Sequence, residues 1–180
     1  RVLFRSLLPA IVGEPWGYRH RARLSVRNVP KKGGILVGFH ERRSSYVADM
    51  QSCAVLPPRI SGLLLPLRAL VSALSIRERL PQIELAIGGA VDALVLRIRQ
   101  PLTPADEQLL RAFADRNRVQ FFLQTGGPET AAPFYPPHDG LLYYELPEFA
   151  LKLGFSPTEF TQVNHAVNTV LVRDRKSTRL

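Results

Sequence analysis

Three groups of residues in this chain of 180 residues carry side chains suited to binding or catalysis. The first is the run SPTEFTQVN, which begins at Ser156 and ends at Asn164. Ser156 is a suitable N-cap, Pro157 suits the first helical position and Glu159 completes a capping box. The free N–H groups and positive dipole end of a first helical turn favour polar ligands. We therefore expect a helix from Ser156 that presents the amide of Gln162 at the mouth of a site.

The second candidate is Cys53, the single cysteine of the chain. A thiolate can ligate a metal, but a lone cysteine is usually a buried structural residue, and the sequence around Cys53 by itself favours that role. One cysteine cannot form an internal disulfide, which fits a reducing cytoplasm. The histidines show no metal-binding spacing such as H-x-x-x-H, and we assign no role to any of them. They are His20, His40, His138 and His165.

The third group consists of arginines at alternate positions between residues 19 and 27. This alternation predicts a half-buried strand with one cationic face and one apolar face. Guanidinium groups suit phosphates and can stack on unpaired bases, so this face is a candidate RNA contact. Trp16 and Tyr18 could add stacking. The alternative is an ordinary solvated strand face. The arginines concerned are Arg19, Arg21, Arg23 and Arg27.

The composition is that of a globular protein with a basic surface. Hydrophobic residues make up 46% of the chain, charged residues 22%, and the net charge is +9. Such an excess of positive charge favours a polyanionic partner, usually nucleic acid, although a merely basic surface gives the same balance. No apolar run approaches the ~20 residues of a membrane span, and no signal peptide is visible. We expect a cytoplasmic protein that contacts no membrane, and nothing implies a protein partner.

The periodicity predicts an α+β domain with a mostly antiparallel sheet and two or three helices. Apolar residues recur at helical spacing in 60–74, which predicts a helix with a kink or restart at Pro66. A second helix is expected to begin at Thr103. The segment 125–140 is rich in Gly and Pro, which predicts a loop. The last helix should begin at Ser156. We expect strands at 19–29, 35–40, 46–50, 83–87, 93–99, 119–124, 141–146 and 149–153.

Three segments resemble, in the same order, segments of the RNA uracil-C5 methyltransferases. The F-x-Q-x-N run that ends at Asn164 is similar to the segment just before that family's S-adenosylmethionine-binding domain. Residues 15–24, PWGYRHRARL, resemble the start of the central domain in the bacterial 23S rRNA members that carry an iron–sulfur cluster. Residues 51–56, QSCAVL, are similar to the stretch that holds the last cluster cysteine. Together the three segments extend over most of the chain.

This resemblance implies an internal fragment of an S-adenosylmethionine-dependent 23S rRNA uracil-C5 methyltransferase. It implies that Gln162 lies at the cofactor and target-base site and that Arg23 lies near the active site. It also makes Cys53 one of four thiolate ligands of a [4Fe–4S] cluster. The family's nucleophilic cysteine, general base and Gly-rich cofactor loop have no counterpart here. We therefore expect no catalytic residue in the fragment, and Cys53 lacks the sequence context of the nucleophile.

Two rival interpretations remain open at this point. A non-catalytic RNA-binding module explains the basic strand, but it does not explain the segment around Gln162 or the context of Cys53. A basic structural domain explains still less. Within the enzyme interpretation, another cluster-bearing rRNA subfamily that modifies a different uracil is the second choice.

The expected organisation has four parts. Residues 15–153 form a central RNA-binding α+β domain, and residues 154–174 begin a Rossmann-like methyltransferase domain. Residues 1–14 are a linker or non-native sequence, and residues 175–180 are a non-native tail. We expect non-native ends because Arg1–Ser6 match no expected motif and because the helical spacing of apolar residues is lost from Arg173 onward.

Overall fold

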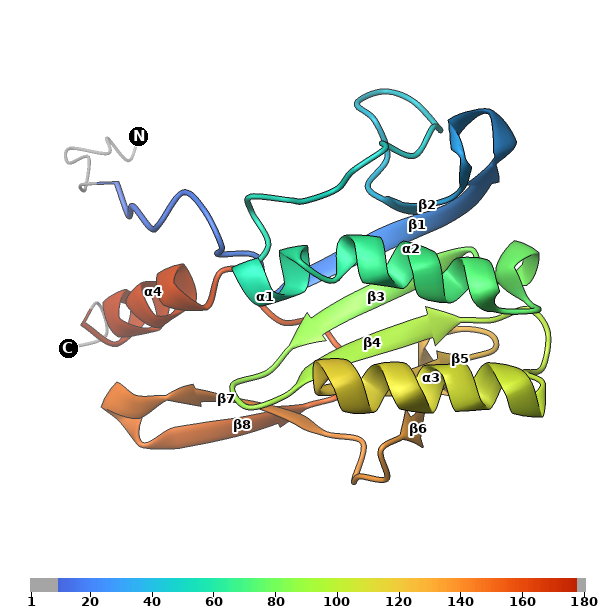
Figure 1. Cartoon of the computed structure of the whole chain (residues 1–180). Coiled ribbons are helices and arrows are strands. Elements are labelled where there is room, and N and C mark those ends of the chain that lie inside the picture. The colour runs from blue at the N-terminus through green and yellow to red at the C-terminus, as the bar shows by residue number, and fades with distance from the viewer. Residues whose placement is uncertain (1–9, 178–180) are drawn as a thin grey trace.

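The computed structural model describes residues 10–177, which form a central sheet with helices on one face (Figure 1). Six strands follow one another across the sheet in the order β2-β1-β3-β4-β5-β6, and β7 and β8 form a separate hairpin. All neighbouring pairs are antiparallel except β4 and β5, which are parallel and joined through α3. The predicted α+β class with a mostly antiparallel sheet is therefore confirmed.

The elements have the following bounds. The strands are β1 Arg21–Val29, β2 Gly34–Gly38, β3 Gln82–Ile87, β4 Asp92–Arg97, β5 Val119–Gln124, β6 Ala132–Tyr135, β7 Leu142–Leu146 and β8 Leu151–Phe155. The α-helices are α1 Pro58–Ser61, α2 Leu64–Ala73, α3 Pro104–Asn117 and α4 His165–Ser177. Short 3-10 turns include η1 Pro30–Lys32 and η2 Arg77–Arg79.

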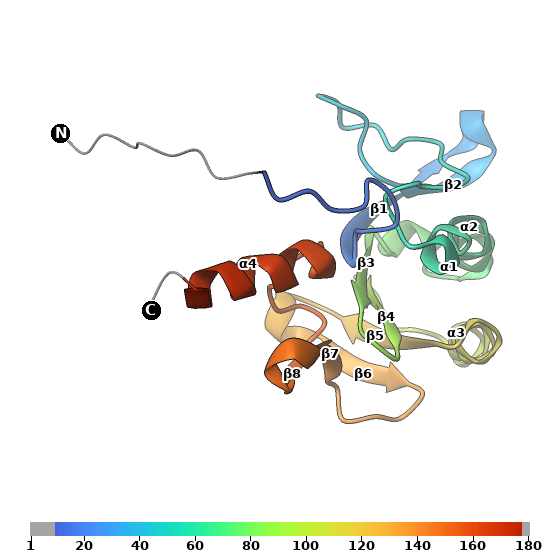
Figure 2. The ribbon, with the colours of Figure 1, turned by 90° about the vertical axis from the view of Figure 1, so that its left-hand side faces the viewer.

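The sheet separates two layers, as Figure 2 shows: α1, α2 and α3 lie on one side, and α4 with the β7–β8 hairpin lies on the other. The larger core lies under the helices and includes Leu24, Ile83 and Phe121, each with an exposed fraction of 0%. A smaller core lies between the sheet and the hairpin, where Val95 and Phe122 pack with residues of β7 and β8. Of the described residues, none belongs to a helix long and apolar enough to cross a bilayer.

The helix α3 begins where the local sequence signals predict it. Thr103 caps the helix: its Oγ1 accepts a hydrogen bond from the Asp106 N–H at 3.2 Å, and the Asp106 carboxylate accepts from the Thr103 N–H at 2.9 Å. The same carboxylate accepts from the N–H and hydroxyl of Ser75, at 2.7 and 2.6 Å. Asp106 therefore joins the start of α3 to the end of the α2 segment.

Three expectations about elements are wrong. No helix begins at Ser156: residues 156–164 form turns and irregular chain, and α4 starts at His165. The segment 46–50 is not a strand, since it contributes only an isolated bridge between His40 and Val47. The loop 125–140 contains β6, whose single proline, Pro133, is tolerated because the strand lies at the sheet edge.

The expectations for the two ends are only partly testable. The non-native origin expected for Arg1–Ser6 lies outside the described residues. At the other end, α4 continues past Arg173 to Ser177, so the loss of apolar period there does not end the helix. Whether residues 175–180 are native stays a hypothesis.

Asp106 should set part of the acid stability. Burial raises the pKa of its carboxyl, but the hydrogen bonds from Ser75 and Thr103 outweigh this and lower it from 3.8 to about 2. The stabilisation is thus complete above the unfolded value of 3.8 and is lost as the pH falls toward 2. We expect Asp106→Asn to reduce the free energy of unfolding by about 2 kcal/mol at pH 7. Urea titration measures this effect.

The matched control is Glu107→Gln, which removes the neighbouring, half-exposed carboxylate of the same helix. Its ion pair with Arg111 is an exposed i,i+4 pair, so we expect a change within about 0.5 kcal/mol. Equal losses in the two variants would show that Asp106 does not connect α2 to α3 energetically.

Candidate functional site

Main-chain hydrogen bonds bring three distant segments together at the start of β1. The N–H of Gly17 donates to the Ala54 carbonyl at 2.8 Å, and the N–H of Arg19 donates to the Val55 carbonyl at 2.9 Å. The next N–H, that of His20, donates to the Val163 carbonyl at 2.7 Å. Residues 15–24, 51–56 and 160–164, which the sequence singled out separately, therefore meet at one place.

The arginines of β1 lie on the face predicted for them. Ala22, Leu24 and Val26 are buried under the helices, whereas Arg23 and Arg27 are exposed on the opposite face. This agrees with the two-residue period of a strand. β1 therefore contributes one face to the core and the other to a polar surface.

A buried carboxylate, Glu84 of β3, fixes two of these arginines. Glu84 is only 6% exposed, and β3 places it directly opposite Arg23. Its Oε1 accepts hydrogen bonds from Nε of Arg23 at 2.9 Å and from Nε2 of Gln82 at 2.9 Å, and Nη2 of Arg23 lies 2.7 Å from the same oxygen. Nη2 of Arg21 lies 3.8 Å from Oε2. Pairing compensates the cost of burying the Glu84 charge.

Arg21 keeps an unsatisfied donor in this site. Its Nη1 is buried, and no hydrogen-bond partner for it exists among the described residues. Burial is the largest effect on its guanidinium and lowers its pKa; Glu84 opposes this, and Arg23 adds to it. Arg21 lines a hollow of about 250 Å³ with Arg19, Ala22, Arg23, Glu84 and Val163. The hollow therefore joins the arginine face to the segment that contains Gln162.

The other two arginines take different positions. Nη1 of Arg19 donates to the Arg21 carbonyl at 3.4 Å, a long hydrogen bond that leaves it beside the hollow. Arg27 lies near the far end of β1, opposite Leu36 of β2, and does not line this hollow. The four arginines therefore form a track along one strand rather than one cluster.

Gln162 lies near this hollow, but in irregular chain rather than in a first helical turn. Its side chain is exposed, and its neighbour Val163 supplies the carbonyl bound by His20. Phe160, two residues earlier, is 83% exposed. Asn164 is the residue that caps α4, because its Oδ1 accepts a hydrogen bond from the Val167 N–H at 3.0 Å. The Ser156–Glu159 pattern forms a turn, in which the Glu159 carboxylate accepts from the Ser156 N–H at 2.7 Å.

A stack of rings, which the sequence did not indicate, attaches the start of α4. The ring centres of His20 and His165 are 4.2 Å apart at an interplanar angle of 15°, and the Tyr144 ring stacks on His165 with the ring centres 5.5 Å apart. Nδ1 of His20 lies 2.9 Å from the Tyr18 carbonyl, so this nitrogen carries the proton. Burial, followed by the nearby His20, lowers the pKa of His165 to about 4. His165 is therefore neutral at pH 7.

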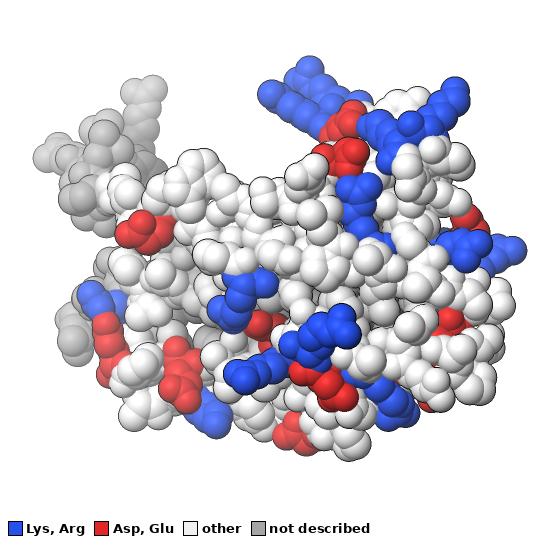
Figure 3. Space-filling model, viewed as in Figure 1, with Lys and Arg blue, Asp and Glu red and all other residues white. Residues whose placement is uncertain are grey.

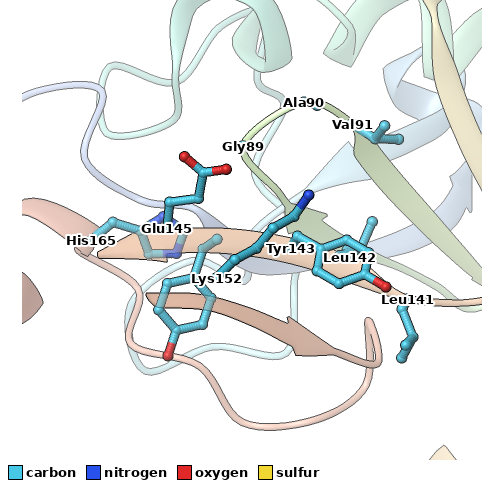
Figure 4. Close-up of a pocket in the computed structure, with 10 residues that line it drawn as sticks. Gly89, Ala90, Val91, Leu141, Leu142, Tyr143, Glu145, Lys152 and His165 are labelled. Atoms are coloured by element: carbon cyan, nitrogen blue, oxygen red, sulfur yellow. The ribbon is translucent and has the colours of Figure 1, made fainter. Parts of the chain in front are cut away.

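His165 also borders a larger pocket, which the close-up in Figure 4 shows. The pocket measures about 520 Å³ and lies between the turn Gly89–Val91 and the strands β7 and β8. The Gly89 N–H donates to the Tyr143 carbonyl at 2.8 Å and holds the turn against the hairpin. Lys152 lies 4.8 Å from the centre of the Tyr143 ring. The binding residues predicted from the sequence do not line this pocket.

Cys53 lies across β1 from these features. It is half-buried against the main core, and its N–H donates to Oγ of Ser61 at 2.8 Å. No group of three or more His, Cys, Asp or Glu within residues 10–177 is arranged to hold a metal ion. One thiolate cannot hold an iron–sulfur cluster, so the described residues do not fit this group by themselves.

Sequence reasoning missed Glu84, His20, His165 and Tyr144. A signal for Glu84 was present, because Gln82, Glu84 and Ala86 alternate with the apolar residues of β3 and thus mark its non-core face. The ring stack gave no such signal, since its members come from three segments that are far apart in sequence.

No protein-family model matches the chain. The chain is similar to curated proteins named 23S rRNA (uracil(1939)-C(5))-methyltransferase RlmD. Identity is 66% over 167 residues to that of Nitrosospira multiformis, covering 93% of this chain and 38% of the relative. Identity to the protein of Cupriavidus necator is 64% over 171 residues, covering 95% of this chain and 38% of the relative. Identity to the protein of Dechloromonas aromatica is 61% over 173 residues, covering 96% of this chain and 40% of the relative. The chain thus spans about two fifths of the length of these relatives.

A solved structure has a similar fold. It is the tRNA (uracil-54, C5)-methyltransferase of Pyrococcus abyssi in complex with S-adenosyl-L-homocysteine, with a TM-score of 0.65 and 14% identity. The similarity covers 91% of this chain and 42% of that chain. At this identity it concerns the fold alone, and it supports the α+β assignment.

The ring stack predicts a pH dependence of stability. Below its ordinary pKa of 6.5, His165 binds a proton in the unfolded chain, but in the folded chain it does so only near pH 4. Stability is therefore complete above pH 6.5 and falls as the pH drops toward 4. We expect His165→Phe, which keeps a stacking ring without titrating, to remove about 2 kcal/mol of this loss. Urea titrations at several pH values measure it.

The control is His40→Gln, which removes an exposed histidine that contacts Ser25. This variant should keep the pH dependence of the parent. A pH profile of His165→Phe that coincides with that of the parent would contradict the burial of neutral His165.

Proposed function

Because the chain belongs to the same family as the 23S rRNA (uracil-C5)-methyltransferases, we propose that it forms part of an enzyme that methylates carbon 5 of a uracil in ribosomal RNA. S-adenosylmethionine would supply the methyl group. The single observation that carries the proposal is the meeting of residues 15–24, 51–56 and 160–164 at the start of β1, beside an arginine-lined hollow.

The chain's own part in this reaction would be to bind and position RNA. Arg23 is 66% exposed at its side chain although Glu84 holds it, so its guanidinium is both oriented and accessible. Arg21 lines the same hollow beside it and adds a second guanidinium to the polar wall that a phosphate or a base edge would meet. A uracil that reacts at carbon 5 must leave its stack, and pre-oriented donors beside the hollow would stabilise the extruded nucleotide.

We propose that Gln162 reaches the cofactor and target-base site from the other side of the hollow. An amide offers both a donor and an acceptor, which suits a uracil edge or the amino-acid end of the cofactor. The proximity of Val163 to Arg21 and Arg23 supports this role. The nucleophile and the general base are proposed to belong to the rest of the enzyme, so this segment contributes no catalytic residue.

We also propose a domain organisation that the layers of the structure support. Residues 15–153 would be the central RNA-binding domain, and residues 154–174 would begin the methyltransferase domain. In support, Phe155 is the last residue packed in the smaller core, and beyond it the chain leaves the hairpin. Val170 and Leu171 of α4 are exposed by 37% and 42% and are available to pack against a following domain. A cytoplasmic location stays a prediction.

The direct experiment is methyl transfer from labelled S-adenosylmethionine to unmodified 23S rRNA by the full-length protein that contains this chain. We expect Gln162→Ala to lower the single-turnover rate by at least about tenfold, because it removes a positioned hydrogen-bonding group. Gln108→Ala on the exposed surface of α3 is the matched control and should react like the parent.

Two results would count against this proposal. Equal rates for Gln162→Ala and Gln108→Ala would remove Gln162 from the site. RNA binding without methyl transfer by the full-length protein would favour the non-catalytic RNA-binding module instead.

We also propose that Cys53 supplies one thiolate to a [4Fe–4S] cluster whose other ligands come from the rest of the enzyme. We expect Cys53→Ser in the full-length protein to lower the bound iron per protein and the visible absorbance of the cluster. Ser52→Ala, at the exposed neighbouring position, should leave both unchanged. Iron content equal to that of the parent in Cys53→Ser would return Cys53 to a structural role.

A further inference from the structure

A second basic hollow lies at the far end of β1. Its walls are the end of β1 at Val26–Asn28, the turn η2 with Leu80 and Pro81 after it, and Arg99, which follows β4. Its volume is about 230 Å³. The Val26 N–H donates to the Pro81 carbonyl at 2.9 Å, and the Arg99 N–H donates to the Arg79 carbonyl at 2.8 Å. The backbone of the hollow is therefore held by the sheet.

Four arginines line this hollow, which we name the arginine pocket: Arg27, Arg77, Arg79 and Arg99. All four are exposed. Its single acidic residue, Glu78, accepts a hydrogen bond from the side-chain amide of Asn28. The pocket therefore carries a large local excess of positive charge.

These arginines differ from others on the surface. Arg23, Arg59 and Arg68 each lie within 2.7 Å of a carboxylate oxygen. Among the ion pairs of residues 10–177, none involves an arginine of the pocket. Like charges that share a hollow repel one another, and an anion bound between them relieves this repulsion.

The surrounding surface continues the positive charge. Figure 3 shows Lys and Arg side chains gathered above β1 and β2, at the upper right of the molecule. The residues of the turn after β1 include Lys31 and Lys32 of η1. Arg27 also shares its face of β1 with Arg21 and Arg23. Six residues separate Arg21 from Arg27, which is about 20 Å along a strand.

We propose that the arginine pocket binds a backbone phosphate of the substrate RNA, a few nucleotides from the target uracil. This inference rests on the proposed function, which supplies the polyanion. Guanidinium forks pair with phosphate oxygens through two parallel hydrogen bonds, and several forks facing one hollow can share a single phosphate. The hollow between Arg21 and Glu84 would then hold the reacting region, and the arginine pocket would fix the direction of the strand.

The test compares two double variants of the full-length protein that lose the same charge. Arg77→Gln/Arg79→Gln removes half of the pocket's cations, and Arg116→Gln/Arg118→Gln removes two exposed arginines at the end of α3. Fluorescence anisotropy measures binding of a labelled 23S rRNA fragment at several salt concentrations. We expect the pocket variant to lose at least about tenfold in affinity at low salt and to reduce the salt slope by about 0.7 to 0.9, the value for one phosphate. The control should change the slope by less than about 0.5.

The outcomes separate this inference from the proposed function. A parent that binds and methylates RNA, with equal affinities and slopes in both double variants, overturns the arginine pocket and leaves the function intact. A parent that neither binds nor methylates RNA overturns both. Stabilisation by inorganic phosphate that only the pocket variant loses, with RNA binding unchanged, overturns the inference in favour of a small-anion site. Thermal unfolding of both variants checks that each remains folded.

Discussion

Three main-chain hydrogen bonds donated by residues 17–20 hold the candidate site together. The N–H groups of Gly17, Arg19 and His20 each need a partner, and each finds a carbonyl outside its own segment. Two of these carbonyls belong to residues 54 and 55, beside Cys53, and the third belongs to Val163. Because β1 follows directly from this segment, any displacement of residues 17–20 moves its arginines as well. The site is therefore an assembly of extended segments, whose geometry depends on how β1 enters the sheet.

The carboxylate of Glu84 then divides the arginines of β1 by role. Burying an unpaired carboxylate is costly, so Glu84 must keep Arg23 and Arg21 near it. This requirement orients two guanidinium groups before any ligand arrives, which lowers the entropy that binding must remove. Arg27 lies beyond the reach of Glu84 and lines a hollow with three other arginines, none of which forms an ion pair within residues 10–177. One strand therefore carries two arginines that are held in place at its start and one, Arg27, that remains available near its end.

Elements with local signals could be predicted from the sequence, whereas features set by distant contacts could not. Thr103 and Asp106 define the start of α3 within four residues, and the alternation of β1 identifies both of its faces. β6 was missed because turn-forming residues dominate its surroundings, and only the edge position of the strand makes Pro133 acceptable. The stack of His20 on His165 joins positions that no short sequence window contains. The track of arginines was predictable, but the carboxylate that orients it was not recognised.

Because the last helix begins at His165 and not at Ser156, Gln162 is held in position by different interactions from those that the sequence predicts. In the capping pattern that begins at Ser156, Gln162 would lie close to the positive end of a helix dipole. In the structure, the Ser156–Glu159 contact closes a turn, and Asn164 takes over the capping of α4. The chain between these two points runs beside β1, where His20 binds the Val163 carbonyl. Tertiary pairing with the start of β1 has outweighed a local helix signal, so the position of Gln162 depends on the same segment that positions Arg21 and Arg23. A ligand that contacts both the Gln162 amide and these arginines would therefore bind two chain segments. The hydrogen bond from the His20 N–H to the Val163 carbonyl helps to fix their relative positions.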